Sequence, residues 1–346
     1  MKRPIFWKIL VFGGAFDPIH DGHLALLRRA RQEIKPNQTL IIPTGDIPVH
    51  KRKTLLPAKE RAILIQNATR KMSATTLLTY EIKRKHPAYA WHTLNFIFRK
   101  FPNAEIYFLL GSDNLPSLSS WFKIKEILKY PRLTFVIGRR RGARNFKCGV
   151  SPGKVRFLRG AFPKVASSVL RQEENLPELI TACIRFRLPD SRYRHTLACA
   201  KLAMELARHW KADVRKAQIA ALLHDISRTQ EKFLSAREAI AHGPKSARLA
   251  QKLFGIYDKE VLEAIASHTT GRPHMGKLAQ ILYLADLGSY DRKFKEAKRI
   301  RELARKNLRL ALALGVRVKI DYLRQAGQPI HPRTFQFLKS LGTVTP

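Results

Sequence analysis

The sequence predicts two domains of different fold class, an α/β doubly wound domain followed by an all-α domain. In the first half, short apolar runs alternate with amphipathic helical stretches, which is the pattern of a parallel sheet covered by helices. In the second half the strand signals stop, and long stretches with helical periodicity dominate. Because 346 residues suffice for two hydrophobic cores, we expect one domain at 1–174 and another at 183–346.

The elements of the first domain follow from its apolar and amphipathic runs. Strands are expected at Ile9–Phe12, Leu40–Pro43, Ile106–Leu110 and Leu133–Ile137. Helices are expected at Leu24–Ala30 and near 57–72, 90–100 and 117–129. In a parallel doubly wound sheet, ligands bind beyond the carboxyl ends of the strands. Functional residues should therefore lie in the loops that follow the strands.

The segment Gly13–Leu24, which reads GGAFDPIHDGHL, joins the first expected strand to the first expected helix. The unpaired N–H groups and the dipole of a helix N-terminus favour a bound phosphate. Gly13 and Gly14 let the backbone approach a ligand closely. His20 and His23 are three residues apart, so they point the same way at a helix start. Two imidazoles at this place suit the charge of a transferring phosphoryl group.

Later polar residues follow the other strands or begin a helix. They are Lys51 after the second strand, Asp113 and Trp121 after the third, Arg139 after the fourth, and Ser167, Ser168 and Arg171 at an expected helix start. The basic side chains could bind phosphates, and the tryptophan could stack on a flat heterocycle. Each also has an ordinary structural explanation, since a tryptophan can belong to the core, a basic run can be solvated surface and serines can cap a helix.

Taken in order, these motifs resemble the bacterial nicotinate-nucleotide adenylyltransferases, from residue 8 to about 172. The family's PPHK-like loop, its G-x-D…W segment and its closing I-S-S-T-x-I-R correspond to Pro48–Lys51, Gly111–Trp121 and Val165–Arg171. The resemblance implies a Rossmann-like nucleotidyltransferase fold. It also implies transfer of adenylate from ATP, with Mg²⁺, to nicotinate mononucleotide, which gives deamido-NAD and pyrophosphate.

The resemblance assigns roles to residues at matching positions. The residues expected to carry the transfer are His20, His23, Lys51 and Arg171. The residues expected to bind ATP or the acceptor are Gly13, Gly14, Phe16, Asp113, Trp121, Arg139, Ser167 and Ser168.

Three positions depart from the family pattern. Ala90 and His92 replace the threonine and the aspartate of the family's SYT-x-D-T-L segment, and Ala166 replaces the first serine of the closing motif. The family threonine is expected near the carboxylate of nicotinate. Because Ala90 lacks the threonine hydroxyl, the acceptor is either nicotinate or nicotinamide mononucleotide.

The second half is expected to be helical after a short junction at 172–187 that has room for one helix. Its expected helices span 191–209, 213–225, 231–241, 244–254, 258–268, 275–287 and 292–314. In or next to these helices lie six polar residues that suit a divalent metal: His195, His224, Asp225, His242, His268 and Asp286. Burying an adjacent His-Asp pair is costly unless a metal or a partner satisfies it. Taken singly, His268 could belong to the core, His242 could precede a turn at Pro244, and Asp286 could cap a helix.

The order H…HD…D resembles the HD phosphohydrolase superfamily. The finer pattern includes Arg192–Thr196, His242-Gly243-Pro244 and His268–Gly271. It resembles the YqeK-type, symmetrically cleaving bis(5′-nucleosyl)-tetraphosphatases over roughly residues 180–340.

That resemblance implies a dinuclear metal site, with iron as the expected metal, and cleavage of diadenosine tetraphosphate into two ADP. The implied core ligands are His195, His224, Asp225 and Asp286, completed by His242 and His268. Arg292 matches an arginine that holds phosphate, and Ser289 replaces a family glutamate.

The charge leaves an alternative open. The chain has 65 basic and 26 acidic residues, a net charge of +39 that is spread over both halves. This charge suits polyanionic ligands and would also attract RNA. A basic RNA-binding protein with inactive catalytic folds is therefore one alternative, and a hydrolase of another nucleotide is a second. Nucleic-acid binding is not expected, because both histidines of the first motif and all four core ligands of the second are retained.

A cytoplasmic location is expected. Cys148, Cys183 and Cys199 are scattered and form no C-x-x-C pair, which fits a reducing compartment. No apolar run reaches the length of a membrane helix, and Lys8 interrupts the apolar start of the chain, so no signal peptide is expected. The expected partners are small nucleotides, and the sequence does not predict the oligomeric state.

Overall fold

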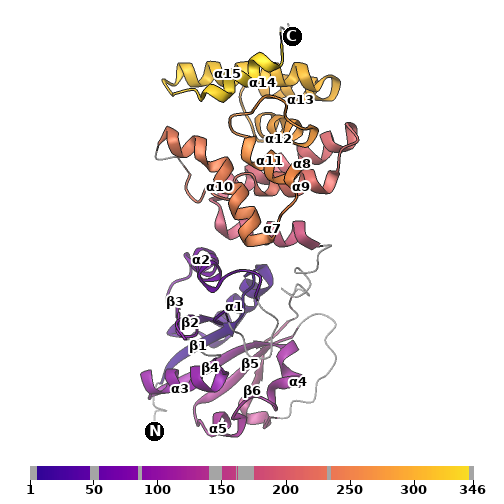
Figure 1. Ribbon diagram of the computed structural model, residues 1–346. Coiled ribbons are helices and arrows are strands. Elements are labelled where there is room, and N and C mark those ends of the chain that lie inside the picture. Colours follow the sequence, from indigo (N-terminus) through magenta and orange to yellow (C-terminus); the bar gives the residue numbers. More distant parts are fainter. Residues whose placement is uncertain are drawn as a thin grey trace. The chain divides into compact units, whose positions relative to one another are not determined.

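A computed structural model divides the chain into two compact units, Met1–Glu173 and Glu174–Pro346 (Figure 1). The structure describes residues 6–46, 54–84, 88–139, 150–160, 162, 175–231 and 235–342. The first unit is a parallel α/β fold and the second is helical, which confirms the predicted fold classes.

The first unit is built on one six-stranded sheet in the order β3-β2-β1-β4-β5-β6, with all neighbouring strands parallel. The strands are β1 (Trp7–Gly14), β2 (Gln38–Pro43), β3 (Thr75–Leu77), β4 (Ala104–Gly111), β5 (Leu133–Gly138) and β6 (Val155–Phe157). The α-helices are α1 (Asp21–Ile34), α2 (Ala58–Thr69), α3 (Ala90–Lys100), α4 (Leu115–Leu118) and α5 (Ile124–Leu128). The chain reverses its direction of strand addition between β1 and β4, and this switch point is where such sheets bind ligands.

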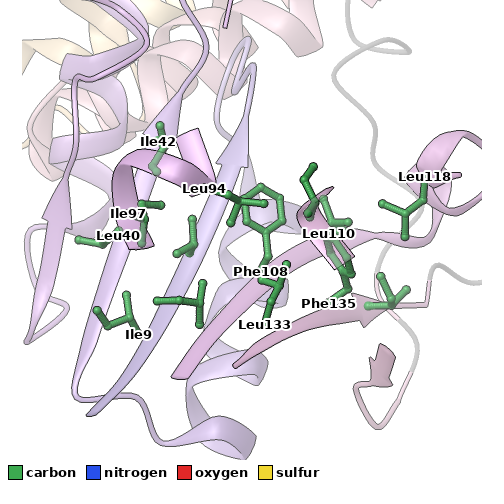
Figure 2. Close-up of a cluster of buried hydrophobic side chains, with 14 of the residues drawn as sticks. Ile9, Leu40, Ile42, Leu94, Ile97, Phe108, Leu110, Leu118, Leu133 and Phe135 are labelled. Atoms are coloured by element: carbon green, nitrogen blue, oxygen red, sulfur yellow. The ribbon is translucent and has the colours of Figure 1, made fainter. Parts of the chain in front are cut away.

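The core of the first unit lies on the central strands, as Figure 2 shows. Buried on both faces, parallel strands require nearly continuous apolar runs, and β1 and β5 have them. Helix α3 covers one face of the sheet with Leu94 and Ile97, which pack with Phe108 and Phe135. This packing holds β1, β4 and β5 side by side, so the loops at their carboxyl ends start from fixed positions.

The first unit differs from the expectation in three places: two short strands were not predicted, and one predicted helix is divided in two. Strands β3 and β6 have three residues each and lie at the two edges of the sheet, so they lack a recognisable apolar pattern. The single helix expected at 117–129 is wrong. It is replaced by α4 and α5, because Lys123 adopts the left-handed conformation with φ 55° between them.

The second unit is all helical in the described residues. Its helices are α7 (Leu176–Arg187), α8 (Asp190–His209), α9 (Val214–Leu223), α10 (Ala236–Phe254), α11 (Lys259–Ser267), α12 (Lys277–Gly288), α13 (Glu296–Lys306), α14 (Leu308–Gln325) and α15 (Pro332–Ser340). Helix α12 packs against α8, α9, α11, α13 and α14, and it is apolar nearly all round because it is central. Among the described helices, none is both long and apolar enough to cross a bilayer.

Helix boundaries in the second unit differ from expectation at three places. The helices expected at 231–241 and 244–254 form one helix, α10, which runs through Pro244. The helix expected at 292–314 is two helices, because the side chain of Asn307 caps α14 by accepting a hydrogen bond from Leu310 N. Helix α7 packs against α8 and α9, so most of the junction expected at 172–187 belongs to the second unit.

Candidate functional sites

The carboxyl edge of the sheet gathers several of the predicted residues of the first unit. Strand β1 ends in Gly13 and Gly14, and Asp113 lies in a short 3₁₀ helix directly after β4. Gly111 pairs with Gly138, which Arg139 follows at the end of β5. The loops of three neighbouring strands therefore meet at one edge, at the switch point of the sheet.

The two glycines are needed for space. A Cβ at Gly13 would lie 3.3 Å from the ring of Phe108, and one at Gly14 would lie 3.3 Å from the ring of Phe16. Contacts this short oblige the neighbouring ring to move. The pair therefore allows two aromatic rings to pack tightly under the loop, in addition to leaving its backbone open to a ligand.

His20 and His23 lie together at the N-terminus of α1. His20 is the N-cap residue of the helix. Its imidazole ring stacks on that of His23, with the two centroids 3.8 Å apart. The backbone N–H of His20 donates to Nδ1 of His23 at 3.3 Å. In the neutral imidazole of His23 the proton is therefore on Nε2, which becomes a hydrogen-bond donor beside the helix end.

Phe16 packs against His23 from inside the protein. It is buried, with a left-handed backbone at φ 48°. Its ring meets the ring of Phe12 edge-on at 5.0 Å and that of His23 at 5.1 Å. The side chain expected to bind substrate thus packs against a histidine of the motif.

Sequence reasoning missed the residue that joins the loops of this site, Arg61 of α2. Its guanidinium is fully buried and donates to the carbonyl oxygens of Ala15, Thr44 and Gly45 at 2.6, 2.8 and 3.1 Å. Burial lowers its pKa, and the nearby carboxylates of Asp17 and Asp46 oppose that shift. The signal was available, because Arg61 lies on the buried face of α2 with Ala58, Leu64 and Ile65.

Asp17 fixes another part of the same loop. Its carboxylate accepts hydrogen bonds from the backbone N–H groups of Leu55 and Leu56 at 2.7 and 2.9 Å. The FDP part of the first motif is therefore tied to the segment that leads into α2. Together with Arg61, this bond explains why the motif needs an aspartate at a buried position.

Trp121 packs toward the core. It is partly buried, and its ring meets those of Phe108 and Phe135 edge-on at 6.2 Å each. Arg139 is exposed, with its guanidinium 4.5 Å from the centre of the Phe157 ring. Lys51, Ser167, Ser168 and Arg171 lie outside the described residues.

The departures from the family pattern lie at the start of α3. His92 accepts a hydrogen bond from Tyr89 N at 3.2 Å, and its ring lies near that of Phe122. Burial lowers the pKa of His92, and Arg84 and Lys123 lower it further, so the ring is neutral at neutral pH. The start of α3 therefore lies near two cations from other segments, Arg84 and Lys123, and near the aromatic ring of Phe122.

In the second unit, all six predicted ligands converge from five helices. His195 comes from α8, His224 and Asp225 from the end of α9, His242 from α10, His268 from the end of α11 and Asp286 from α12. Nε2 of His195 lies 2.9 Å from Oδ1 of Asp286, and Nε2 of His242 lies 3.1 Å from Oδ1 of Asp225. The structure thus brings the six residues together.

Three of the histidines are oriented by their own helices. Nδ1 of His224, His242 and His268 lies 2.7, 2.6 and 2.7 Å from the carbonyl oxygen three residues earlier. Each Nδ1 therefore carries a proton and donates it, which leaves each Nε2 as an acceptor. Burial lowers the pKa of His224 and of His268, so both rings stay neutral.

The cluster fits a divalent metal. Nε2 of His242 and Nε2 of His268 face each other at 2.9 Å, although both are acceptors. Nε2 of His224 is buried, and no described residue offers it a hydrogen bond. The hydroxyl of Thr269 lies 3.2 Å from Nε2 of His242 and 3.3 Å from Nε2 of His268, but its single hydrogen can serve only one of them. A cation satisfies the remaining lone pairs.

The geometry contains two overlapping ligand groups that share His224. One comprises His195, His224 and Asp286, and the other comprises His224, Asp225 and His268, each with its ligand atoms within 4.8 Å of one another. Oδ1 of Asp225 faces His242, while Oδ2 lies 3.7 Å from Nε2 of His224. A carboxylate with its oxygens turned to different histidines suits two neighbouring ions.

Sequence reasoning missed Asp291, which orients His195. Its carboxylate accepts a bond from Nδ1 of His195 at 3.0 Å, and Ser289 Oγ lies 3.3 Å from the same nitrogen. Burial lowers the pKa of His195, but the bonds to Asp286 and Asp291 outweigh it and raise the pKa to about 9. Asp291 could have been found as an acidic residue one position before the predicted Arg292.

A cavity of about 1290 Å³ opens beside the cluster and is lined by Asp225, His242, His268 and Asp286. Four basic side chains line it as well: Arg192, Arg228, Arg292 and Lys319. Nη2 of Arg292 lies 2.7 Å from Oδ1 of Asp286, and Nη1 of Arg228 lies 3.5 Å from Oδ2 of Asp225. The cavity therefore combines candidate metal ligands with positive charge, which suits a ligand with several phosphates.

Two family descriptions match the chain. The description "Cytidylyltransferase-like" matches residues 11–178, and the description "HD domain" matches residues 192–291. A protein of Mycoplasma genitalium, named a probable nicotinate-nucleotide adenylyltransferase/Ap4A hydrolase, is 28% identical over 88% of this chain and 95% of its own.

Proteins that resemble only one half of the chain are more similar in sequence. A symmetrical bis(5′-nucleosyl)-tetraphosphatase of Bacillus subtilis is 34% identical over 44% of this chain and 91% of its own. A probable nicotinate-nucleotide adenylyltransferase of Aliarcobacter butzleri is 36% identical over 40% of this chain and 75% of its own. The chain therefore joins a member of the nicotinate-nucleotide adenylyltransferase family to an HD-domain member of the symmetrical bis(5′-nucleosyl)-tetraphosphatase family.

Proposed function

We propose that this chain is a bifunctional enzyme. Its first domain, at 1–174, transfers adenylate from ATP to nicotinate mononucleotide. Its second domain, at 183–346, hydrolyses diadenosine tetraphosphate to two ADP. The observation that carries the proposal is that six histidines and aspartates of the second unit converge beside a cavity lined by several arginines, while His20 and His23 stack at a helix N-terminus in the first.

The transfer reaction needs alignment and charge compensation more than covalent chemistry. An oxygen of the acceptor phosphate bonds to the α-phosphorus of ATP, the bond to the next phosphate breaks, and pyrophosphate leaves. Nε2–H of His23 would donate to a phosphate oxygen, with His20 beside it and the N-terminus of α1 adding positive potential. Mg²⁺, bound with ATP, would offset charge on the phosphates.

The remaining predicted residues of the first domain complete this proposal. Lys51 and Arg171 would contact the phosphates, with help from Gly13, Gly14, Ser167 and Ser168. Asp113, Trp121 and Arg139 would line the nucleotide and acceptor sites, and Phe16 would act by positioning His23. Arg84 and Lys123, which lie near the start of α3, support an acceptor that carries a carboxylate, although Ala90 lacks the hydroxyl expected there.

The HD domain would bind two divalent ions, which we propose to be iron. His195, His224, Asp225 and Asp286 would be the core ligands, with His242 and His268 completing the second position. When bound, the ions would neutralise phosphate charge and activate a water molecule.

The protein's own groups would then direct the cleavage. Arg192, Arg228 and Arg292 line the cavity and would bind the phosphates. Asp291 would hold His195 in the tautomer that presents Nε2 to the metal. The oxygen of water bonds to one of the two central phosphorus atoms, the bridging P–O bond breaks, and each half leaves as ADP.

Two parallel assays on the purified, iron-loaded chain test the proposal. One supplies ATP, Mg²⁺ and either nicotinate or nicotinamide mononucleotide, and the other supplies diadenosine tetraphosphate. We expect pyrophosphate release with the nicotinate acceptor and ADP as the sole hydrolysis product. Transfer to the nicotinamide acceptor alone would show that Ala90 changes specificity. Absence of turnover in both assays, with metal bound, would refute the proposal.

We also propose that the enzyme acts in the cytoplasm. Cys183 and Cys199 are buried free thiols, which suit a reducing compartment. Co-purification with the cytoplasmic fraction of the source cells would test this, and recovery from an oxidising compartment would contradict it.

A further inference from the structure

Two walls of the cavity beside the HD cluster each contribute a basic and an aromatic side chain, next to the acidic Glu296 on one wall and Asp321 on the other. One wall is the segment after α12, which carries Arg292 and Phe294. The other is α14, which carries Lys319 and Tyr322. Each wall thus offers one cation and one aromatic ring to the same cavity, and the two walls come from different elements.

One of the two cations contacts a candidate metal ligand, and the other contacts the backbone next to one. Nη2 of Arg292 bonds to Oδ1 of Asp286 at 2.7 Å. Nζ of Lys319 donates to the carbonyl oxygen of Thr269, the residue next to His268. Phosphates that lie at the metal ligands would therefore have both cations nearby.

The two aromatic rings are accessible to a ligand. The side chain of Phe294 is 36% exposed and that of Tyr322 is 68% exposed, although both line the cavity. Tyr322 lies three residues after Lys319 on α14, so the two side chains share one face of the helix. Phe294 lies two residues after Arg292. In each pair the ring is free to stack on a nucleobase, as the flat faces of bases do on aromatic side chains.

We infer that the cavity holds a dinucleoside polyphosphate through two half-sites, Arg292 with Phe294 and Lys319 with Tyr322. Each half-site binds one nucleotide, with the base on the ring and the phosphates toward the cation. This inference rests on the proposed hydrolysis and adds how the substrate is held. Two similar half-sites around one metal cluster place the middle of the phosphate chain at the ligands, which accounts for cleavage into equal halves.

Steady-state kinetics of the full-length, metal-loaded chain with diadenosine tetraphosphate test the inference. Tyr322→Ala and Phe294→Ala should each raise KM about tenfold, the order expected for one lost stacking contact, with kcat and metal content unchanged. Tyr322→Phe and Phe294→Tyr retain a ring and should keep the KM of the wild type. Tyr257→Ala is the matched control, because it removes a 71% exposed ring that does not line the cavity.

A ligand with a single base separates two half-sites from one. Adenosine 5′-tetraphosphate should inhibit with nearly the same constant in either single alanine variant, since its base can use the remaining ring. The constant should rise only in the double variant. A single variant that matches the double variant would overturn the inference, and so would an unchanged KM for diadenosine tetraphosphate in both single variants. A wild-type chain that leaves diadenosine tetraphosphate intact would overturn both the inference and the proposed hydrolysis.

Discussion

At the scale of single residues, each candidate histidine ligand in the HD cluster has its ring fixed by a second bond. Backbone carbonyls three residues earlier hold Nδ1 of His224, His242 and His268, while the carboxylate of Asp291 holds Nδ1 of His195. The difference between a carbonyl and a carboxylate partner matters for charge. Burial lowers the pKa of His224 and of His268, whereas the bonds to two carboxylates raise the pKa of His195 to about 9.

This difference predicts that metal uptake releases a proton from His195. The metal-free native state holds this proton up to about pH 9, whereas the unfolded state loses it near 6.5. The proton therefore stabilises the metal-free fold fully below pH 6.5, and this contribution disappears as the pH rises through 9. Metal affinity should rise over the same interval, because the metal replaces the proton.

Calorimetric titration of metal at pH 7.5, in buffers of different ionisation enthalpy, should report about one proton released per chain. Asp291→Asn should reduce this number, since the substitution removes one of the carboxylates that raise the pKa of His195. Metal affinity that does not change between pH 6.5 and 9 would contradict the assignment.

A second prediction at this scale concerns Arg61. Arg61→Met removes a buried cation that satisfies three carbonyl oxygens of the loops at the proposed nucleotide site. Unpaired buried carbonyls cost about 1–3 kcal/mol each, so the first unit should lose about 3 kcal/mol of unfolding free energy or more. Urea unfolding followed in the first unit, together with the transfer rate, measures the effect. Arg70→Met, at the exposed end of α2, is the control and should leave both unchanged.

At the scale of elements, the sequence predicted the elements with strong patterns and failed where tertiary packing decides. Strands β1, β4 and β5 are continuous apolar runs, so their positions follow from periodicity alone. The edge strands β3 and β6 are too short to carry a pattern. Pro244 suggested a break, yet α10 continues through it because the helix is held by its packing on α11.

The same helix pair explains the glycine that precedes the proline. A Cβ at Gly243 would lie 2.8 Å from the carbonyl oxygen of Ala266 in α11, closer than real Cβ contacts allow. Gly243 therefore lets α10 approach α11 closely enough to bring His242 within 2.9 Å of His268. No sequence pattern reveals this contact, because it joins residues of two helices.

Gly243→Ala should push the two helices apart and weaken metal binding. The expected loss is about 10- to 100-fold in metal affinity and in hydrolysis. Substitutions of other residues that orient a metal ligand without binding the metal have effects of this size. Metal content after dialysis and kcat for diadenosine tetraphosphate measure it. Gly276→Ala is the matched control, because a Cβ there meets nothing within 4 Å. Equal behaviour of the two variants would show that close approach of α10 and α11 is not needed.

At the scale of the whole molecule, the described parts of the two candidate sites come from separate compact units. His20, His23 and Arg61 belong to the first unit, and the His and Asp cluster with its cavity belongs to the second. Each unit has its own buried core, so a polar substitution in one site should not unfold the other.

The two activities should therefore be separable by single substitutions. His23→Ala removes the proposed donor to the phosphates and should lower transfer at least about 100-fold, while hydrolysis stays at the wild-type rate. Asp225→Asn removes the carboxylate that faces His224 and His242, so it should abolish hydrolysis and leave transfer unchanged. Both assays run on the same preparation of each variant decide the matter. Loss of both activities in either variant, with folding intact by circular dichroism, would show that the two sites depend on each other and that the units do not work independently.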